Sequence, residues 1–333
     1  MNEQTDPAMR FSEPPPYRPG LAVAGIHEIW GEIERLDLVR NVAELEAFGF
    51  TVIPPDRAAP SGLADRLCAA VLDVAAERWG VRLDPAEDFP STGPTNVPDP
   101  QDWANMLNRP TLHADFPQIP RVYEEALMNP VLLALVTYML GYQCLLSSGF
   151  GAWIKGRNPG ETFPLHMDGA RVSPALANAD CCNAMYLLSD HSLADGATCF
   201  VAGSHKLQRA PAHGEGLDER IALAAPAGSL VVWHGNTWHG AFPRTKPGLR
   251  ISMPLFFCRP QLRTFSNYEH RPIPQEMLDR NPPRFSTLLG RELDWREYCK
   301  LERGAKTDFH SAAGSSQENI GAMALRAMSL FGA

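Results

Sequence analysis

The residues best suited to chemistry in this sequence are His166 and Asp168, which stand two positions apart at the end of a predicted strand. Alternate residues of a strand project from the same face, so the imidazole and the carboxylate can bind one ion. With a histidine from a neighbouring strand they would form the two-histidine, one-carboxylate set that holds non-haem Fe(II) and leaves coordination positions open. A third ligand further along the chain therefore decides the chemistry.

A His-x-Asp pair is weak evidence by itself, because the chain holds ten histidines and repeats the pattern at His113 and Asp115. His113 lies in a proline-rich segment, ahead of the region in which strands are predicted. His166 lies inside that region, with enough chain after it for later strands to return to it. We therefore predict His166 and Asp168 as ligands, and we interpret His113 and Asp115 as solvated or lid residues.

Two downstream histidines compete for the third position. Residues 228–234 read as a buried strand that ends in His234, and 235–239 continue it to His239. The odd spacing places the two imidazoles on opposite faces of one continuous strand, unless Gly235 introduces a bulge. The choice between them depends on the segment that follows.

Arg250 decides in favour of His239. Residues 240–249 read as a turn and 250–258 as a return strand, so the predicted hairpin brings Arg250 beside His239. A guanidinium beyond the iron suits a chelating 2-oxo acid, whose keto oxygen and one carboxylate bind the metal while the far carboxylate forms a bidentate salt bridge. Ser252 faces the same side as Arg250 and is predicted to donate to the same carboxylate.

Short strands must position these residues. Their density between about 143 and 258 favours a sandwich or a double-sheet barrel over alternating strands and helices. A further short strand is predicted at 49–53. The predicted strands of the barrel are 143–148, 151–156, 163–168, 181–188, 197–201, 228–234 and 249–257.

The N-terminal half is predicted to be mainly helical. Apolar residues recur at helical spacing over 25–47, across more than one helix. Ser61 is predicted to cap a helix that runs to about Trp79. A further helical pattern covers 123–140 and is interrupted at Pro130.

The remaining segments suggest one domain with covers and tails. Residues 21–303 are predicted to form this domain, with its barrel core at about 143–258. The proline-rich segment 85–120 is predicted to be a lid, and 262–303 a cover over the barrel. Residues 1–20 read as an extended N-terminal arm. Residues 304–333 form a C-terminal tail with helical spacing, which either frays or docks on the body or in a homo-oligomer.

Composition narrows the function classes. The 333 residues are 44% hydrophobic with a net charge of −8, which suits a globular protein and argues against a nucleic-acid partner. We expect no membrane-spanning helix, because no run of about 18 apolar residues occurs. The N-terminus lacks the pattern of a secretory signal. The seven cysteines lack the spacing of a disulfide framework, so we expect reduced thiols in a cytoplasmic protein. We also expect the partner of this protein to be a small-molecule substrate.

Other polar residues of the strand region are interpreted as structural. His205 reads as a hairpin histidine, and His234 as a buried, hydrogen-bonded residue. Lys155 is the exception, because an inward-facing lysine requires an anionic partner. It is therefore a candidate for a substrate contact.

From about Leu132 to Phe257 the chain resembles the phytanoyl-CoA dioxygenase (PhyH-like) branch of the Fe(II)/2-oxoglutarate oxygenases. The motifs that carry the resemblance are the His166–Asp168 pair, the stretch 194–205 that ends in Gly-Ser-His, and the interval from His239 to Arg250. The stretch 194–205 and the interval from His239 to Arg250 are together much more specific to this family than the His-x-Asp pair alone.

The resemblance implies an all-β core with flanking helices, a double-stranded β-helix (jelly roll, cupin-like). It implies His166, Asp168 and His239 as Fe(II) ligands and Arg250 as the anchor for 2-oxoglutarate. Ser252 and Ser148 are implied as further cosubstrate contacts. The chain departs from the family pattern at Met185, where an aromatic residue is common, and at Ala202, where proline is usual.

The implied reaction is that of an Fe(II)/2-oxoglutarate-dependent dioxygenase. Such an enzyme uses O2 to convert 2-oxoglutarate to succinate and CO2 while it hydroxylates, desaturates or cyclises a small organic substrate, for example in specialised metabolism. Related halogenases replace the carboxylate ligand with a small residue, so Asp168 favours oxygenation. The alternative of another class is a non-catalytic jelly-roll binding protein that keeps the metal site.

Overall fold

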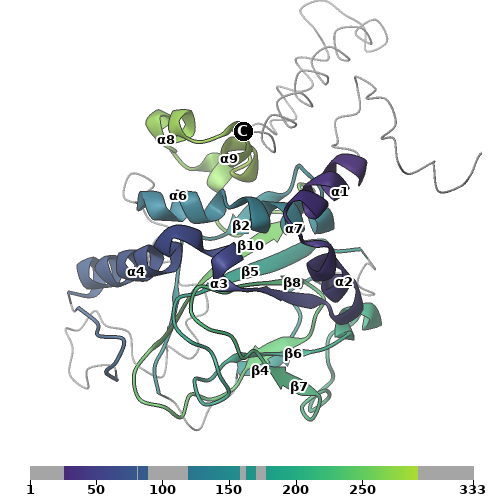
Figure 1. The fold of residues 1–333 in the computed structure, drawn as a ribbon, viewed down its shortest axis with the longest axis vertical. Coiled ribbons are helices and arrows are strands. Elements are labelled where there is room, and N and C mark those ends of the chain that lie inside the picture. The colour runs from purple at the N-terminus through teal and green to yellow at the C-terminus, as the bar shows by residue number, and fades with distance from the viewer. Residues whose placement is uncertain (1–25, 81, 89–118, 158–162, 170–177, 292–333) are drawn as a thin grey trace, which may run out of the picture.

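A computed structural model of the chain describes residues 26–80, 82–88, 119–157, 163–169 and 178–291. Within these residues two antiparallel sheets face each other, and helices cover the outer face of the larger sheet (Figure 1). The strands are β1 (Phe50–Ile53), β2 (Leu145–Ser148), β3 (Trp153–Lys155), β4 (Phe163–His166), β5 (Cys181–Leu187), β6 (Thr198–Val201), β7 (Arg220–Ala222), β8 (Leu230–His234), β9 (His239–Ala241) and β10 (Arg250–Cys258).

The larger sheet has the order β1-β8-β5-β10-β2, with β3 also paired to β10, and the smaller sheet has the order β4-β9-β6-β7. The central strand β5 is buried along its whole length, because both of its faces are covered. Ala184 and Tyr186 face the helices, whereas Met185 and Leu187 pack between the two sheets. The space between the sheets is therefore the interior of a jelly roll, which confirms the predicted fold class.

The helices are α1 (Ile26–Arg35), α2 (Val39–Phe48), α3 (Pro55–Ala58), α4 (Leu63–Trp79), α6 (Arg121–Leu127), α7 (Pro130–Leu140), α8 (Gln275–Arg280) and α9 (Pro283–Leu288), with short 3-10 turns η2 (Pro60–Gly62), η4 (Ser204–Leu207) and η5 (Tyr268–His270). Helix α7 packs on β5 and β8. Asn129 fixes its start, accepting a hydrogen bond from the Val131 amide at 3.0 Å and donating to the Ala58 carbonyl at 2.7 Å. The helical layer thus holds the larger sheet from outside.

The start of α4 differs from the prediction. Ser61 lies in η2 with a φ of 58°, and α4 begins at Leu63 after Gly62, which makes no side-chain cap. Ser61 therefore does not cap this helix. The predicted end holds, since Gly80 adopts the left-handed conformation with a φ of 67°. Strands β7 and β9, each of three residues, are absent from the predicted set.

The prediction that residues 228–239 form one strand is wrong. Strand β8 ends at His234 in the larger sheet, and β9 begins at His239 in the smaller one. The predicted hairpin from His239 to Arg250 is wrong for the same reason, because β10 returns to the larger sheet. Arg250 lies opposite Lys155 of β3 instead. In a jelly roll the chain changes sheet at each of these turns.

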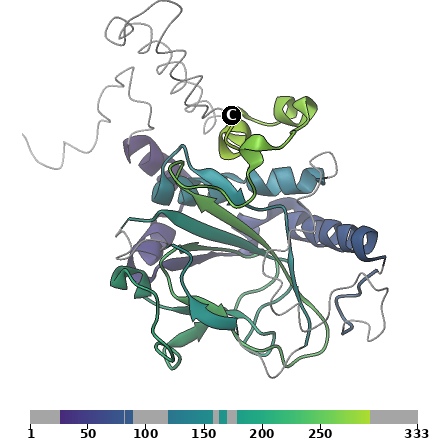
Figure 2. The ribbon, with the colours of Figure 1, turned by 180° about the vertical axis from the view of Figure 1, so that it is seen from behind.

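The C-terminal part of the described chain packs on the helical layer, not over the smaller sheet. Arg280 of α8 forms a salt bridge with Glu124 of α6, and Arg284 of α9 lies over the Tyr142 ring at 4.1 Å. Seen from behind, these yellow-green helices lie on the side opposite the smaller sheet (Figure 2). The predicted cover thus closes the helical side as far as Arg291.

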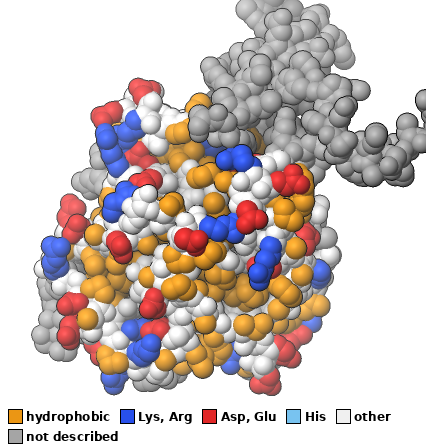
Figure 3. Space-filling view, viewed as in Figure 1, with side chains coloured by type: hydrophobic (Ala, Val, Ile, Leu, Met, Phe, Trp, Pro, Cys, Tyr) orange, Lys and Arg blue, Asp and Glu red, His pale blue; other side chains and the backbone are white. Residues whose placement is uncertain are grey.

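Several predictions fall on residues that the structure does not describe. They concern the arm at 1–20, the tail at 304–333, His113 and Asp115, and most of the 85–120 lid. The described start of that lid is anchored at the Arg250 end of the barrel, where the Leu249 amide donates to the Pro85 carbonyl at 2.8 Å. No helix within the described ranges is long and apolar enough to cross a membrane. On the face shown in Figure 3, acidic and basic side chains are interspersed.

Candidate metal centre and cosubstrate pocket

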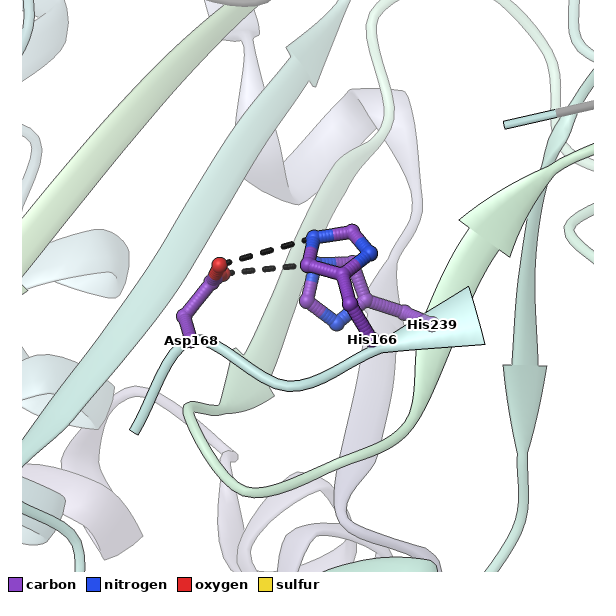
Figure 4. A group of neighbouring side chains, drawn as sticks. All are labelled: His166, Asp168 and His239. Atoms are coloured by element: carbon purple, nitrogen blue, oxygen red, sulfur yellow. Dashed lines mark ion pairs between the residues drawn. The ribbon is translucent and has the colours of Figure 1, made fainter. Parts of the chain in front are cut away.

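The three predicted ligands meet between the sheets. His166 at the end of β4 and His239 at the start of β9 are directly opposite each other in the antiparallel pair, with ring centroids 4.2 Å apart. Asp168 follows β4 and turns its carboxylate toward both imidazoles (Figure 4). One ligand atom from each residue lies within 4.8 Å of the other two. No other group of this kind occurs among the residues that the structure describes.

The backbone holds Asp168 against the turn that connects the two sheets. The amides of Asp168 and Gly169 both donate to the Gly235 carbonyl at 2.9 Å. Gly235 has no room for a side chain, because a Cβ atom there would lie 2.3 Å from the Cys181 sulfur and 2.7 Å from its carbonyl oxygen. Gly235 therefore allows the chain to approach Cys181 closely, and its carbonyl holds the backbone of Asp168 in place.

Both histidines are oriented by backbone carbonyls. The Nδ1 atoms of His166 and His239 lie 3.0 Å from the Pro164 carbonyl and 2.9 Å from the Thr237 carbonyl. An Nδ1–H that donates there leaves each Nε2 lone pair available to a metal. These Nε2 atoms lie 3.5 and 3.3 Å from the Asp168 oxygens. Metal bonds of about 2.1 Å at right angles separate ligand atoms by about 3 Å, so this spacing suits one ion.

The electrostatics of the cluster favour an ionised carboxylate. Burial raises the pKa of Asp168, but the two imidazoles outweigh burial and bring this pKa well below its usual range. Burial lowers the pKa of His166, and its contacts with Asp168 reverse that and raise it. The carboxylate is thus negatively charged, as a ligand of a divalent cation must be.

Asn183 supports the carboxylate and was not predicted from the sequence. Its Nδ2 atom donates to Asp168 Oδ2 at 2.7 Å, from the inner face of β5. Partners of this kind fix the orientation of a metal ligand. The available signal was a single polar residue in the otherwise apolar run Cys181–Leu187.

Arg250 and Ser252 lie on the inner face of β10 and fit the distal carboxylate of a 2-oxo diacid. Both are buried, and the Arg250 Nε and Ser252 Oγ atoms have no hydrogen-bond partner among the residues that the structure describes. The NH1 group of Arg250 donates to the Gly196 carbonyl. No carboxylate of the described chain forms an ion pair with Arg250. Burial, and then the charge of Arg244, lower the pKa of Arg250 to about 10, so the guanidinium stays charged near neutral pH.

Strand register relates the metal cluster to Ser252 and Arg250. Asn183, which contacts Asp168, lies opposite Phe256, and Leu187 lies opposite Ser252. Leu187 lies four positions beyond Asn183, about 13 Å along the strand, so Ser252 lies at a distance from the metal cluster that accommodates a five-carbon diacid, and Arg250 lies two residues further along β10. Ser148 lies opposite Phe256, level with the metal cluster and not with Arg250. Its predicted cosubstrate contact would therefore concern the chelating end.

The structure separates the other predicted polar residues from this cluster. His234 and His205 have ring centroids 5.3 Å apart and line a cavity of about 500 Å³ outside the two sheets. The His234 Nδ1 atom accepts a hydrogen bond from the Asn236 amide at 3.0 Å. Lys155 donates to the Phe242 carbonyl at 2.5 Å beside Arg250. Its predicted substrate contact stays a prediction.

Comparison with known proteins adds the family. The sequence pattern of the family described as Phytanoyl-CoA dioxygenase (PhyH) matches residues 67–252, more than half of the chain. The chain belongs to the phytanoyl-CoA dioxygenase family. This membership confirms the resemblance predicted from the sequence, and the matched range contains the three clustered residues, Arg250 and Ser252.

Among curated relatives of this PhyH-family protein is "Dioxygenase af480" of Aspergillus fumigatus, which is 29% identical over 178 residues. The match covers 52% of this chain and 56% of that protein, so it spans little more than half of the relative's length.

Similar crystal structures include the α-ketoglutarate-dependent epimerase SnoN from nogalamycin biosynthesis, with 17% identity and a TM-score of 0.47 over 70% of this chain and 86% of SnoN. HygX from Streptomyces hygroscopicus, with nickel and 2-oxoglutarate bound, has 16% identity and a TM-score of 0.48 over 68% of this chain and 88% of HygX. At such values the similarity says nothing about the reaction of this PhyH-family chain.

Proposed function

We propose that this protein is an Fe(II)- and 2-oxoglutarate-dependent dioxygenase that oxidises a small organic molecule. One observation carries the proposal. His166, Asp168 and His239 converge inside the barrel, and the same interior contains the buried, charged Arg250, which has no carboxylate partner among the described residues. Two imidazoles and one carboxylate are the ligand set of non-haem Fe(II) oxygenases. The guanidinium supplies the second recognition element that a 2-oxo diacid requires.

The protein's own residues would place the reactants. His166, Asp168 and His239 would hold Fe(II), and Asn183 and the Gly235 carbonyl would keep the carboxylate in position. Bound Fe(II) supplies the O2 chemistry that couples conversion of 2-oxoglutarate to succinate and CO2 with oxidation of the substrate. Arg250 and Ser252 would bind the distal carboxylate, and the two sheets would exclude water from the site.

The position of Asp168 supports oxygenation over halogenation. A halide ligand would need the space of this carboxylate, which is anchored by Asn183 and by the two backbone hydrogen bonds to Gly235. Hydroxylation is the simplest outcome, and desaturation or cyclisation of the substrate belongs to the same proposal. A small organic substrate suits a site between two sheets better than a polymer does.

The test is turnover of the purified protein with Fe(II), 2-oxoglutarate and ascorbate over a panel of small metabolites, with release of succinate as the measurement. We expect succinate above the background of an Asp168→Ala variant. Anaerobic addition of 2-oxoglutarate to the Fe(II)-loaded protein should also produce a visible charge-transfer band. Absence of both the band and the succinate would refute the enzyme and leave a non-catalytic binding protein.

A further inference from the structure

His191 is a buried imidazole that no part of the proposed reaction has used. It lies just beyond the end of β5 and is 3% exposed, and within the described part of the chain neither of its ring nitrogens has a hydrogen-bond partner. An unpaired polar group in a protein interior costs free energy, and here two such atoms belong to one ring. A ligand that supplies the missing partner would remove this cost.

The backbone directs His191 into the barrel. His191 and Ala225 form an isolated antiparallel bridge, with the two amides donating to the opposite carbonyls at 2.9 and 3.0 Å. Directly opposed residues in such a bridge project to the same side. Ala225 packs against the cluster between the sheets that includes Leu187. The His191 side chain therefore belongs to the same interior as the proposed cosubstrate.

This end of the barrel is rich in cations. Arg250, Arg244 and Lys155 lie close enough to His191 to lower its pKa further, after burial has already lowered it far below the usual value. Asp195, the carboxylate whose charge acts on Arg250, is already paired with Arg244 at 3.0 Å and with Lys246. The charges at this end thus favour an additional anion.

The donors that remain without an acceptor define what that anion must offer. In the described ranges the buried donors of this kind are the Arg250 Nε–H, the Ser252 hydroxyl and one N–H of the neutral His191 ring. A carboxylate has two oxygens and about four acceptor positions, enough for all three donors. Arg244 already uses four of its five N–H donors, which bond to Gly248, Pro247 and Asp195.

We propose that His191 is a further cosubstrate-binding residue, whose imidazole donates a hydrogen bond to the distal carboxylate of 2-oxoglutarate beside Arg250 and Ser252. The inference rests on the proposed function. His191 would thereby help the protein to distinguish a 2-oxo diacid from a 2-oxo monoacid, because only the diacid has a carboxylate at the Arg250 end of the site.

The test compares two probes, 2-oxoglutarate and 2-oxovalerate, which has the same chelating end but a methyl group in place of the distal carboxylate. Dissociation constants are measured anaerobically on the Fe(II)-loaded protein for wild type, His191→Leu and His191→Gln. We expect His191→Leu to weaken 2-oxoglutarate binding roughly 10- to 100-fold. Binding of 2-oxovalerate should change less than about twofold, and His191→Gln, which keeps a donor, should recover part of the loss.

A matched control is His205→Leu, because His205 is also buried, its Nδ1 atom has no partner among the described residues, and it lies outside the barrel. This variant should bind both probes as the wild type does. Thermal unfolding checks that each variant folds, and His191→Met replaces the leucine variant if that one does not.

An unchanged 2-oxoglutarate affinity in His191→Leu would overturn the assignment. An equal loss for both probes would overturn it too, because it would reveal a general structural role. A wild-type protein that binds Fe(II) but not 2-oxoglutarate would overturn the proposed function together with this assignment, whereas the first two outcomes leave the proposed function intact.

Discussion

Replacing Asn183 with leucine is expected to weaken divalent-metal binding roughly 10- to 100-fold. Asn183 is 7% exposed, and its amide donates to the ionised Asp168 carboxylate at 2.7 Å. A hydrogen bond to a charged group contributes about 1.5–3 kcal/mol, and about 1.4 kcal/mol corresponds to a tenfold change in affinity. Leucine has the same number and branching of side-chain heavy atoms as asparagine, so the change removes the hydrogen bond without opening a cavity.

The measurement is calorimetric titration with Ni(II), a redox-stable substitute for Fe(II), followed by an anaerobic titration with Fe(II). The matched control is Asn41→Leu. Asn41 is 5% exposed and donates to the Thr51 hydroxyl at 2.9 Å, where α2 packs on β1. This variant should lose a similar amount of stability while binding metal as tightly as the wild type.

Two results would contradict this reasoning. Wild-type Ni(II) affinity in Asn183→Leu would mean that the hydrogen bond does not position the carboxylate. Equal weakening in both variants would mean that metal affinity follows overall stability and not the local contact.

The remaining predictions concern the other ligands, the cosubstrate, the turn and pH. His239→Ala should abolish tight Ni(II) binding while His234→Ala keeps it, because only His239 faces the cluster; calorimetry distinguishes the two. Arg250→Ala should raise the 2-oxoglutarate dissociation constant by about 100-fold or more, since a buried charge pair is lost, with Ni(II) affinity unchanged. Gly235→Ala should destabilise the fold by a few kcal/mol, because the added Cβ atom would meet atoms of Cys181. Gly31→Ala in α1, where a Cβ atom meets open space, should instead stabilise the fold by up to about 1 kcal/mol. Urea unfolding measures both changes. Burial lowers the pKa of His234 to about 4, below its unfolded value of about 6.5. As pH falls, His234 is protonated in the unfolded state before it is protonated in the folded state. The free energy of unfolding of the wild type should therefore fall by up to about 3 kcal/mol between pH 6.5 and 4, and that of His234→Gln should not show this loss.

The His-x-Asp pattern was enough to find His166 and Asp168, although β4 ends at His166 and Asp168 lies in the bend that follows it. His239 is the histidine that the structure places beside them, but the predicted hairpin was not the cause. The parity argument assumed one continuous strand, whereas the chain leaves the strand at Gly235 and enters the other sheet. Local pattern does not specify which sheet a strand joins, since that depends on packing between distant segments.

The roles of Asn183 and His191 were not predicted from the sequence, for a related reason. Each acquires its role from a contact across the fold: Asn183 reaches a carboxylate beyond β4, and His191 bridges to Ala225. The start of α4 shows a local limit as well. Ser61 has the right residue type for a cap, but Pro60 and Gly62 on either side direct the backbone into a 3-10 turn.

The pairing of β4 with β9 brings together two histidines that lie far apart in the chain. The unfolded chain therefore has no site with comparable affinity, and metal binding is linked to the closed barrel. At a free metal concentration 100 times the dissociation constant, this linkage adds about 2.7 kcal/mol to the free energy of unfolding. A bound metal thus stabilises the closed barrel against opening of the β4–β9 pair.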